Sequence, residues 1–302
     1  MSWLVPLDIG LVMGLLLAWA VLALTLGFRL LDFPDITVEG SLPLGAAVFA
    51  VLNKSGTPMV VSMLCAMLAG AVTGAFTGFL YIRFKLNKFL AGIIVIAIAY
   101  SLSLRIMGAS NIGLLQSPSV FDLVEPLNRS LPGRFHIGTI LMLSGFIVVG
   151  AVVVLWALST RQGVRLRVAG SNPEYANSLG INVSLNVIVG LAITNAFAAF
   201  SGLLLSMHQG FTDISMGQGV LILALAAMTI GERLLPEKHL PFHAFVFFAA
   251  ILGSVVYQIL VAYAVRVGLA PTDLKLATAI MVLAVVAFRI SRDGELIAEV
   301  HQ

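Results

Sequence analysis

The chain has 302 residues, of which 60% are hydrophobic and only 10% are charged, and its mean hydropathy is +1.05. A soluble domain carries about 25% charged residues, so this composition excludes an ordinary soluble domain and predicts an integral membrane protein with several spans. The net charge of +3 is small, and a single cysteine, Cys65, excludes a disulfide or a thiolate metal site built within one chain.

Hydrophobic runs, taken in chain order, predict the membrane spans. A span needs roughly 20 mainly apolar residues. Runs of that length cover about 9–28, 59–82, 89–107, 138–158, 184–206, 241–265 and 271–289. Two further runs, about 42–53 and 219–231, are too short, and we interpret them as short or broken helices. No basic segment precedes the first run, so we expect it to be a retained span and not a signal peptide.

Each short run follows a polar phrase. "PDITVEGS" at 34–41 and "TDISMGQG" at 212–219 both interrupt hydrophobic sequence. At an offset of 178 residues, Asp35-Ile36-Thr37 aligns with Asp213-Ile214-Ser215. Each phrase follows a long span and precedes a short helix and further long spans. The pattern therefore predicts two halves of similar plan.

The distribution of Lys and Arg predicts the orientation. Clusters occur at Arg83, Lys85 and Lys88, at Arg161, Arg165 and Arg167, at Arg233 and Lys238, and at Arg289 and Arg292. If both short runs cross the membrane, all four clusters and Arg29 lie on one side, which the positive-inside rule makes the cytoplasm. This interpretation gives about nine crossings, in a range of about eight to ten, with an external N-terminus and a cytoplasmic C-terminus. Arg129 and Arg134 fall outside, against the rule.

The fold class that follows is an all-α polytopic membrane protein made of two halves, each with a short broken helix. The whole chain, 1–302, forms one membrane domain with a first half at about 1–158, a cytoplasmic loop at 159–183, a second half at 184–290 and a short cytoplasmic tail at 291–302. The first spans of the two halves run in opposite directions, so the halves form an inverted-topology repeat. Transporters of this plan bind substrate at the repeat interface, on broken helices near the midplane.

The two polar phrases supply candidate residues for a translocation path. A charge at the bilayer centre costs on the order of a few kcal/mol or more, so Asp35, Glu39 and Asp213 are expected to face a cavity or to pair with another group. With their polar neighbours, the candidate path residues are Asp35, Thr37, Glu39, Ser41, Asp213, Ser215 and Gln218. Two alternatives stay open. Asp35 lies in the headgroup region, or Thr37 and Ser215 cap the following helices, the latter through a Ser215-x-x-Gln218 capping box.

Residues inside the spans predict helix packing. Gly70, Gly74 and Gly78 recur every four residues on one helix face, which permits close helix approach within the subunit or, alternatively, at a dimer seam. Asn195, in the middle of its span, is expected to bond to a neighbouring helix. The sequence offers no nucleophile, metal-ligand cluster or acid–base pair, so we predict no catalytic residue and no metal site.

The loop between the halves contains "RVAGSNPEYANSLGINV", residues 167–183. Asn172 is a good N-cap, Pro173 suits the first helical position, and Glu174 in the first turn is favoured by the helix dipole. Gly180 is a typical stop after Leu179. We predict a two-turn helix that lies along the cytoplasmic face and is held by packing, because so short a helix is marginal alone. An ordinary loop helix is the alternative.

The same stretch resembles the coupling-helix motif of ABC importer permeases of the branched-chain amino acid and ribose type. That motif runs roughly Arg-Ala-x-Gly-x-Asn-Pro-x-Ala-Ala, followed by a short gap and Gly-Ile. The matching residues are Arg167, Gly170, Asn172, Pro173, Ala176, Gly180 and Ile181, whereas Tyr175 replaces a usual alanine. "DFPDITVEGSLPLGAA" and "LRIMGASNIGLL" resemble a subgroup of these permeases that usually occurs with binding proteins of a tryptophan or unassigned class. The resemblance covers about 9–290.

The resemblance implies a permease of the bacterial inner membrane that dimerises, as a homodimer, around a central path. It further implies two copies of an ATPase subunit, each gripping one coupling helix, and an extracytoplasmic binding protein that delivers a small solute. The residues implied in coupling are Arg167, Gly170, Asn172, Pro173, Glu174, Tyr175, Ala176, Leu179 and Gly180.

No G-x-x-x-x-G-K-[S/T] phosphate loop occurs in the chain, so ATP and Mg would be bound by the separate partner ATPase. We expect no cofactor in this chain and no nucleic-acid partner. The subgroup resemblance favours an amino acid substrate, an aromatic one in particular. A sugar, nucleoside or vitamin stays open, as does an ion-coupled secondary transporter in which Asp35, Glu39 and Asp213 are the ion-linked groups.

Overall fold

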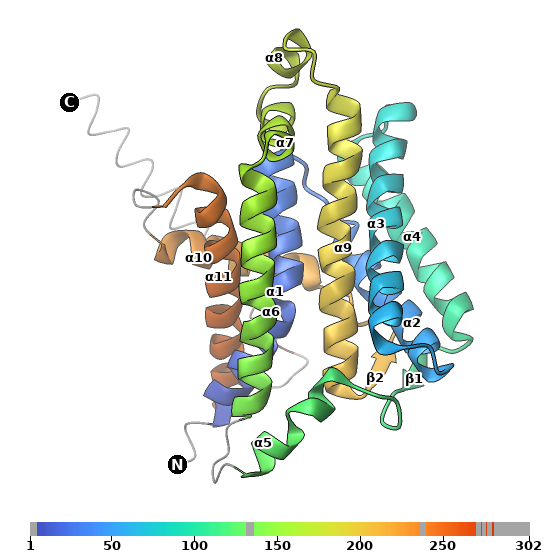
Figure 1. Ribbon diagram of the computed structural model, residues 1–302, viewed down its shortest axis with the longest axis vertical. Helices are drawn as coiled ribbons and strands as arrows, with labels where there is room; N and C mark the ends of the chain where they lie inside the picture. The colour runs from blue at the N-terminus through green and yellow to red at the C-terminus, as the bar shows by residue number, and fades with distance from the viewer. Residues whose placement is uncertain are drawn as a thin grey trace, which may run out of the picture.

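The computed structural model describes most of the chain, and the described part is a bundle of α-helices with one small β-sheet at one end (Figure 1). The described residues are 5–130, 136–235 and 240–269, with positions 273, 276 and 280. The predicted span 271–289 and the tail 291–302 therefore lie outside the described residues, apart from those isolated positions.

Six helices of the described residues are long and apolar enough to cross a membrane. They are α1 (Val5–Leu31), α3 (Met59–Arg83), α4 (Lys88–Met107), α6 (Ile137–Ser159), α9 (Val183–Gln209) and α11 (Phe242–Arg266). Each coincides with a predicted long run to within a few residues. The prediction of a mainly helical, multi-pass membrane protein is therefore confirmed, while the total of nine crossings stays a prediction.

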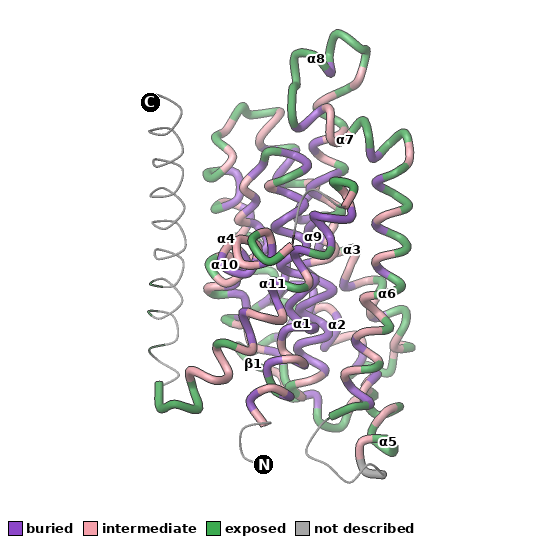
Figure 2. The backbone as a smooth tube through the Cα atoms, turned by 90° about the vertical axis from the view of Figure 1, so that its left-hand side faces the viewer, coloured by how far each residue is buried: buried purple, intermediate pink, exposed green. Residues whose placement is uncertain are grey.

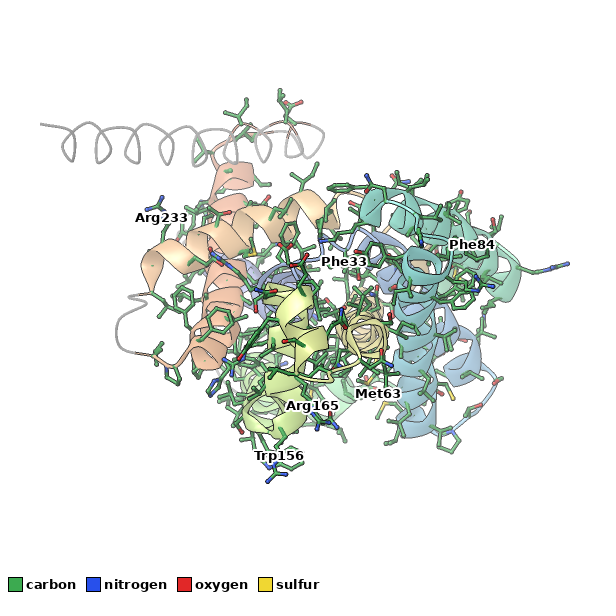
Figure 3. All side chains as sticks on the ribbon, turned by 90° about the horizontal axis from the view of Figure 1, so that it is seen from above. Phe33, Met63, Phe84, Trp156, Arg165 and Arg233 are labelled. Atoms are coloured by element: carbon green, nitrogen blue, oxygen red, sulfur yellow. The ribbon has the colours of Figure 1, made fainter. Side chains whose placement is uncertain are left out.

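The two short runs form the short helices α2 (Val38–Lys54) and α10 (Val220–Leu234). At 1.5 Å per residue each is about 25 Å long or less, which is shorter than a hydrocarbon core of about 30 Å. The chain enters α2 through the non-helical segment 32–37. α10 lies across the axis of the bundle (Figures 1 and 3). Both short runs are thus short helices entered through non-helical backbone, as the polar phrases predict.

The two ends of the bundle carry different structures. The end at the top of Figure 1 carries α7 (Arg161–Ser171) and α8 (Pro173–Ser178). The opposite end carries η1 (Val120–Leu123), α5 (Glu125–Ser130) and the antiparallel strands β1 (Asn111–Gly113) and β2 (Phe211–Asp213). α1 runs toward the α8 end and α9 runs away from it (Figure 1). The inverted repeat itself stays a prediction.

The first long helix of each half packs against the other half. α1 makes its most extensive contacts with α11, whereas α9 makes its own with α3 and α2. A small residue allows the α1–α11 approach, because a Cβ at Gly14 would lie 2.6 Å from the Cα atom of Val255. The Ser254 hydroxyl also donates to the Gly14 carbonyl at 2.8 Å. The first long helix of each predicted half therefore packs mainly against helices of the other predicted half.

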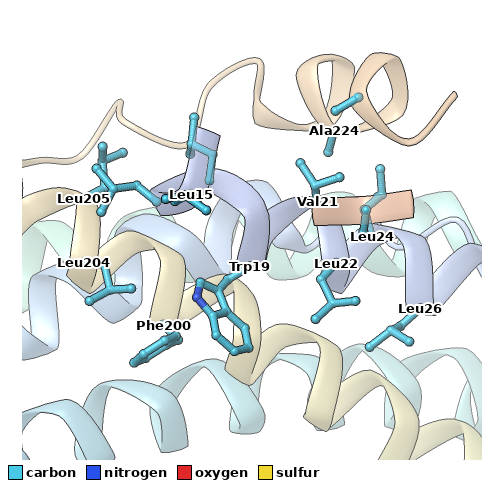
Figure 4. Packing of buried hydrophobic residues seen from close by; sticks show 14 of the residues in the cluster. Leu15, Trp19, Val21, Leu22, Leu24, Leu26, Phe200, Leu204, Leu205 and Ala224 are labelled. Carbon is cyan, nitrogen blue, oxygen red and sulfur yellow. The ribbon is translucent and has the colours of Figure 1, made fainter. Parts of the chain in front are cut away.

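α1 is the central helix and is buried along most of its length, whereas α6 and the outer faces of α3 and α4 are exposed (Figure 2). On α1, the Trp19 ring packs edge-on against Phe200 of α9, with ring centroids 5.1 Å apart, inside a core of aliphatic side chains (Figure 4). The exposed faces are rich in valine, leucine and phenylalanine. Such faces are those expected to contact lipid or another membrane protein.

Gly70, Gly74 and Gly78 all lie buried on the face of α3 that meets α9. Cβ atoms at Gly70 and Gly74 would lie 2.4 Å and 2.0 Å from the carbonyl oxygens of Asn195 and Leu191. Distances this short leave no room for a side chain. The glycines therefore serve packing inside the subunit, and the dimer-seam alternative is wrong.

Gly74→Ala should lower the thermal stability of the protein, because the added methyl group would overlap the Leu191 carbonyl and force α3 and α9 apart. Overpacking of this kind costs about 1–3 kcal/mol. Gly145→Ala on α6 is the matched control, because nothing lies within 4 Å of the place its Cβ would take. Thermal unfolding in detergent, followed by tryptophan fluorescence, measures both variants. Equal unfolding midpoints would contradict this account of the helix contact.

Candidate functional site

The two polar phrases meet in the folded chain. One carboxylate oxygen of Glu39, at the start of α2, accepts hydrogen bonds from the backbone amides of Gly219 and Leu221 at 3.1 and 3.2 Å. The two chain segments also touch directly, because a Cβ at Gly217 would lie 2.1 Å from the Glu39 carbonyl oxygen. The first phrase therefore contacts the start of the second broken helix.

The Glu39 side chain caps the start of α10, although Glu39 itself belongs to α2. The N-cap position of α10 is Gly219, which has no side chain to accept a hydrogen bond. The first amides of a helix have no partner within the helix, and a negative charge beside them is favourable. Glu39 meets both needs. A sequence comparison of the two phrases cannot reveal this contact, because it joins residues 180 positions apart.

A second cluster, the buried polar network, consists of Asp35, Thr37, Ser41, Thr73, Thr77 and Asn195. The Asp35 carboxylate accepts from the Thr37 amide at 3.0 Å and from the Asn195 side-chain amide at 2.5 Å. The Asn195 side-chain oxygen accepts from the Ser41 hydroxyl at 2.6 Å. All six residues are at most 5% exposed. The network thus fixes the non-helical segment 32–37 and α2 to α9.

Two threonines of α3 complete the network. The hydroxyls of Ser41 and Thr73 share a hydrogen bond of 2.7 Å, and those of Thr37 and Thr77 share one of 2.9 Å. Non-helical backbone is tolerated at membrane depth where protein buries it and satisfies its polar groups. The bond predicted from Asn195 to a neighbouring helix is confirmed.

The structure corrects two interpretations of the phrases. Thr37 does not cap α2 with its side chain, since its hydroxyl bonds to Thr77 and its backbone amide is held by Asp35. Ser215 does not cap α10, which begins at Val220. Both residues suit caps by type. A tertiary partner, Thr77, takes the hydroxyl of Thr37, whereas Ser215 bonds locally to Asp213 and the second helix starts later than its sequence pattern indicates.

Asp213, Ser215 and Gln218 lie between β2 and α10 and are more accessible than the network. Asp213 is half-buried, whereas Ser215 and Gln218 are exposed. The Asp213 carboxylate accepts from the Ser215 hydroxyl and from its amide at 2.7 Å, and from the Asn111 side chain at 3.3 Å. The bonds from Ser215 lower the pKa of Asp213 below its ordinary value. This carboxylate is therefore ionised at neutral pH.

The seven candidate path residues fall into two groups. Asp35, Thr37 and Ser41 are fully buried and belong to the buried polar network. Glu39 is half-buried at the contact between α2 and α10. In space it belongs with the more accessible residues of the second phrase, Asp213, Ser215 and Gln218. Within the described residues, no group of three or more His, Cys, Asp or Glu side chains could hold a metal ion.

α8 has the ends predicted for it. The Asn172 side chain accepts from the Tyr175 amide at 2.9 Å, and Pro173 occupies the first turn. At the other end, the amides of Gly180 and Ile181 donate to carbonyls of Asn177 and Ala176, each at 3.0 Å. Gly180 has φ +71°, so these bonds form a Schellman motif that a glycine readily adopts.

The surface of α8 differs from the motif's alanine pattern. Ala176 is fully buried, whereas Tyr175 and Leu179 are each 56% exposed. Glu174 is also exposed. Ala176 therefore anchors α8 to the protein, and the large apolar side chains at Tyr175 and Leu179 form its outer surface.

α7 directly precedes α8 and joins it to the bundle, and it is a helix that we did not predict from the sequence. The Thr160 side chain caps its first turn by accepting from the Gly163 amide, and a polar stretch that follows a good N-cap residue was the available signal. A Cβ at Gly170 would lie 2.0 Å from the Leu30 carbonyl oxygen, so α7 rests directly on the end of α1. The Arg167 guanidinium lies 5.8 Å from the centre of the Phe242 ring of α11.

α1 connects α7 to the two short helices. At the same end of α1, Arg29 forms a two-point ion pair with Glu232 of α10, with the Arg29 Nε atom 2.6 Å from a Glu232 oxygen. Immediately after α1, the segment 32–37 leads into the buried polar network and α2. A displacement of α8 would therefore reach both short helices through α7 and α1.

Asn195→Leu should destabilise the protein, because it leaves the buried Asp35 carboxylate without its side-chain donor. An unsatisfied buried group costs about 1–3 kcal/mol, and a charged one more. Thr194→Val is the control, because the Thr194 hydroxyl bonds only within its own helix, to the Leu191 carbonyl. Unfolding midpoints in detergent measure both. If Thr194→Val lowered the unfolding midpoint as much as Asn195→Leu, the contribution of the buried polar network to stability would be contradicted.

Comparison with known proteins identifies relatives along nearly the whole chain. Residues 7–287 match a family model described as the permease component of branched-chain amino acid transport systems. A tyrosine transport system permease protein of Clostridioides difficile (strain R20291) is 36% identical over 278 residues, which cover 91% of this chain and 88% of the relative. No solved structure matches the chain.

Two further relatives differ in how much of them is matched. An uncharacterized protein of Rickettsia prowazekii (strain Madrid E) is 31% identical over 86% of this chain and 89% of its own length. A galactose/methyl galactoside import permease protein of Salmonella typhimurium (strain LT2) is 30% identical, over 61% of this chain and 54% of its own length.

Proposed function

Because the chain belongs to the family of ABC importer permeases that serve as components of branched-chain amino acid transport systems, we propose that it forms the membrane path for an aromatic amino acid. The match over residues 7–287, which includes both polar phrases and α8, gives the family. The observation that carries the aromatic substrate is the 36% identity to a tyrosine transport permease over 91% of this chain. The chain is a multi-pass protein of the bacterial inner membrane, and an extracytoplasmic binding protein would deliver the substrate.

We assign the path to the junction of the two polar phrases. The Glu39 carboxylate lies there beside the start of α10, and the exposed Gln218 precedes it. Asp213 and Ser215 extend the polar surface toward β2. Glu39 already occupies the amides of Gly219 and Leu221 at the start of α10. The Glu39 and Asp213 carboxylates would therefore accept from the ammonium group of a substrate, and the exposed side-chain amide of Gln218 would donate to its carboxylate. Asp35, Thr37 and Ser41 would support the wall of the path from behind, through the buried polar network.

Both the polar groups of this junction and the name of one relative support an aromatic amino acid as the substrate. An amino acid zwitterion needs an acceptor for its ammonium group and a donor for its carboxylate, and the junction has both kinds of group. The relative named for tyrosine transport matches most of both chains. A galactoside is the second candidate, supported by the 30% identical permease, which matches a smaller part of each chain.

We assign ATP hydrolysis to a separate subunit. The chain has no G-x-x-x-x-G-K-[S/T] loop to hold phosphates, so ATP and Mg would be bound by an ATPase that grips α8. Two ATPase copies would serve a homodimer of permeases. Arg167 and Gly170 would seat the coupling unit on α11 and α1, Asn172, Pro173 and Gly180 would shape α8, and Glu174, Tyr175 and Leu179 would contact the partner.

Uptake of radiolabelled tyrosine tests the proposal. Cells that express this chain with its ATPase and binding protein should take up tyrosine and not galactose, and uptake should survive an uncoupler while ATP is present. Uptake of galactose alone would transfer the proposal to the sugar class. Uptake abolished by the uncoupler at constant ATP would contradict the ABC mechanism and support an ion-coupled transporter.

Tyr175→Asp should abolish most tyrosine uptake while the protein stays in the membrane at its normal level. An aromatic anchor at an interface is worth about 2 kcal/mol or more, which is about thirtyfold in affinity. Phe84→Asp is the matched control, because Phe84 is an aromatic residue at the end of α3 with a similar exposed fraction, 62% against 56%. Normal uptake by Tyr175→Asp would sink the assignment of α8.

A further inference from the structure

A cleft at the α8 end of the bundle lies outside the proposed substrate path, although Leu179 and Gly180 of the coupling stretch border its polar end. Its first part is an apolar groove of about 620 Å³ between α6 and α9, with α1 as its floor. Val153 and Trp156 of α6 form one wall, Ile193 and Phe197 of α9 form the other, and Leu30 lies at the bottom. Trp156 is 70% exposed. The groove is therefore open on its outer side and made almost entirely of hydrocarbon.

The second part of the cleft is polar. It is a groove of about 670 Å³ between α7 and the start of α9, where Arg165, Asn182 and Asn186 contribute polar groups. Gln162, Leu166 and Val189 line both grooves, so the two parts are continuous. We call the whole the amphipathic cleft. It runs from an apolar end along the spans to a polar end under α8.

The polar end carries positive charge. Arg161 and Arg165, one turn apart on α7, are both exposed, and neither has an acidic partner among the described residues. Seen from above, Arg165 and Trp156 lie on the same side of the bundle (Figure 3). Tryptophan is enriched where a membrane meets water, so Trp156 indicates that the change from apolar to polar lining falls near the membrane surface.

We propose that the amphipathic cleft binds an anionic phospholipid from the leaflet on the α8 side, with one acyl chain in the apolar groove and the phosphate group at Arg165. A hydrocarbon groove alone would accept the tail of any lipid. Arg165 at its polar end, with Arg161 one turn away, would select a negative headgroup, because basic residues at a membrane surface attract anionic lipid. The bilayer supplies such a molecule in the orientation that the cleft requires.

The site lies where it can affect coupling. The cleft is bounded by α6, α7 and α9, and α7 is the helix that seats α8 on α1. A bound lipid therefore ties α7 to two long helices without touching the polar junction at Glu39. Lipid binding can be measured without ATP or substrate, so its test is independent of the proposed transport function.

Native mass spectrometry of the purified permease in mild detergent tests the site. After incubation with equal amounts of phosphatidylglycerol and phosphatidylethanolamine, the wild-type chain should retain phosphatidylglycerol in preference. Ile193→Trp fills the apolar groove and should lose this adduct. Val148→Trp is the control, because Val148 is an exposed apolar residue of α6 that lines neither groove.

The headgroup contact has its own pair of variants. Arg165→Gln should lower the retention of phosphatidylglycerol about fivefold, the equivalent of about 1 kcal/mol for one basic residue at an anionic surface. Arg83→Gln, an exposed arginine at the end of α3 and outside both grooves, should leave it unchanged. Equal retention in Ile193→Trp and Val148→Trp, or equal retention of the two lipids by the wild type, would overturn the proposal.

Discussion

The hydrogen bonds that the Glu39 carboxylate accepts from the amides at the start of α10 are the contact on which the arrangement of the two short helices depends. A helix that begins inside a bilayer has free N–H groups and no water to satisfy them, and each such group costs several kcal/mol as an order of magnitude. α10 begins at Val220, and its N-cap residue, Gly219, has no side chain to accept a hydrogen bond, so Glu39 of α2 supplies the acceptor. The buried polar network solves the same problem for the non-helical segment before α2, with Asp35 and Asn195 at its centre. The chain thus tolerates both short helices because a distant residue satisfies polar groups at the start of each one. Glu39 does this for α10, and Asn195 does it for the segment before α2.

Further contacts connect α7 and α8 mechanically to the two short helices. α8 is shaped by its own caps, but its position is set by α7, whose Gly170 rests on the end of α1. α1 is in turn tied to α10 through Arg29 and Glu232, and to α2 through the segment that follows it. A rigid displacement at α8 therefore has a short route to both polar phrases. The amphipathic cleft lies beside this route and not on it, which is why a lipid there would tune the seat of α7 without entering the path.

Much of the fold follows from the sequence because its determinants are local. Six long apolar runs and two short ones define eight helices to within a few residues, and the ends of α8 follow from Asn172, Pro173 and Gly180. The glycines of α3 predict a close contact, but only the structure shows that α9 is the partner. What the sequence could not predict depends on distant neighbours. Thr37 is a good cap residue, yet Thr77, forty residues further on, takes its hydroxyl. Ala176 of the recognised motif is the one buried residue of α8, because it packs against the rest of the protein. The capping of α10 by Glu39 has no local signature at all.

Hydrogen–deuterium exchange at the start of α10 tests the central claim most directly. If the Glu39 carboxylate is the cap of α10, Glu39→Ala should speed exchange of the Gly219 and Leu221 amides, while the exchange of α3 and α9 stays as in the wild type. Glu39→Gln keeps an oxygen acceptor but loses the charge, so its exchange rates at these two amides should lie between those of the wild type and those of Glu39→Ala. Unchanged protection of these two amides in Glu39→Ala would contradict the account, because α10 would then be held in place without the contact from the other half.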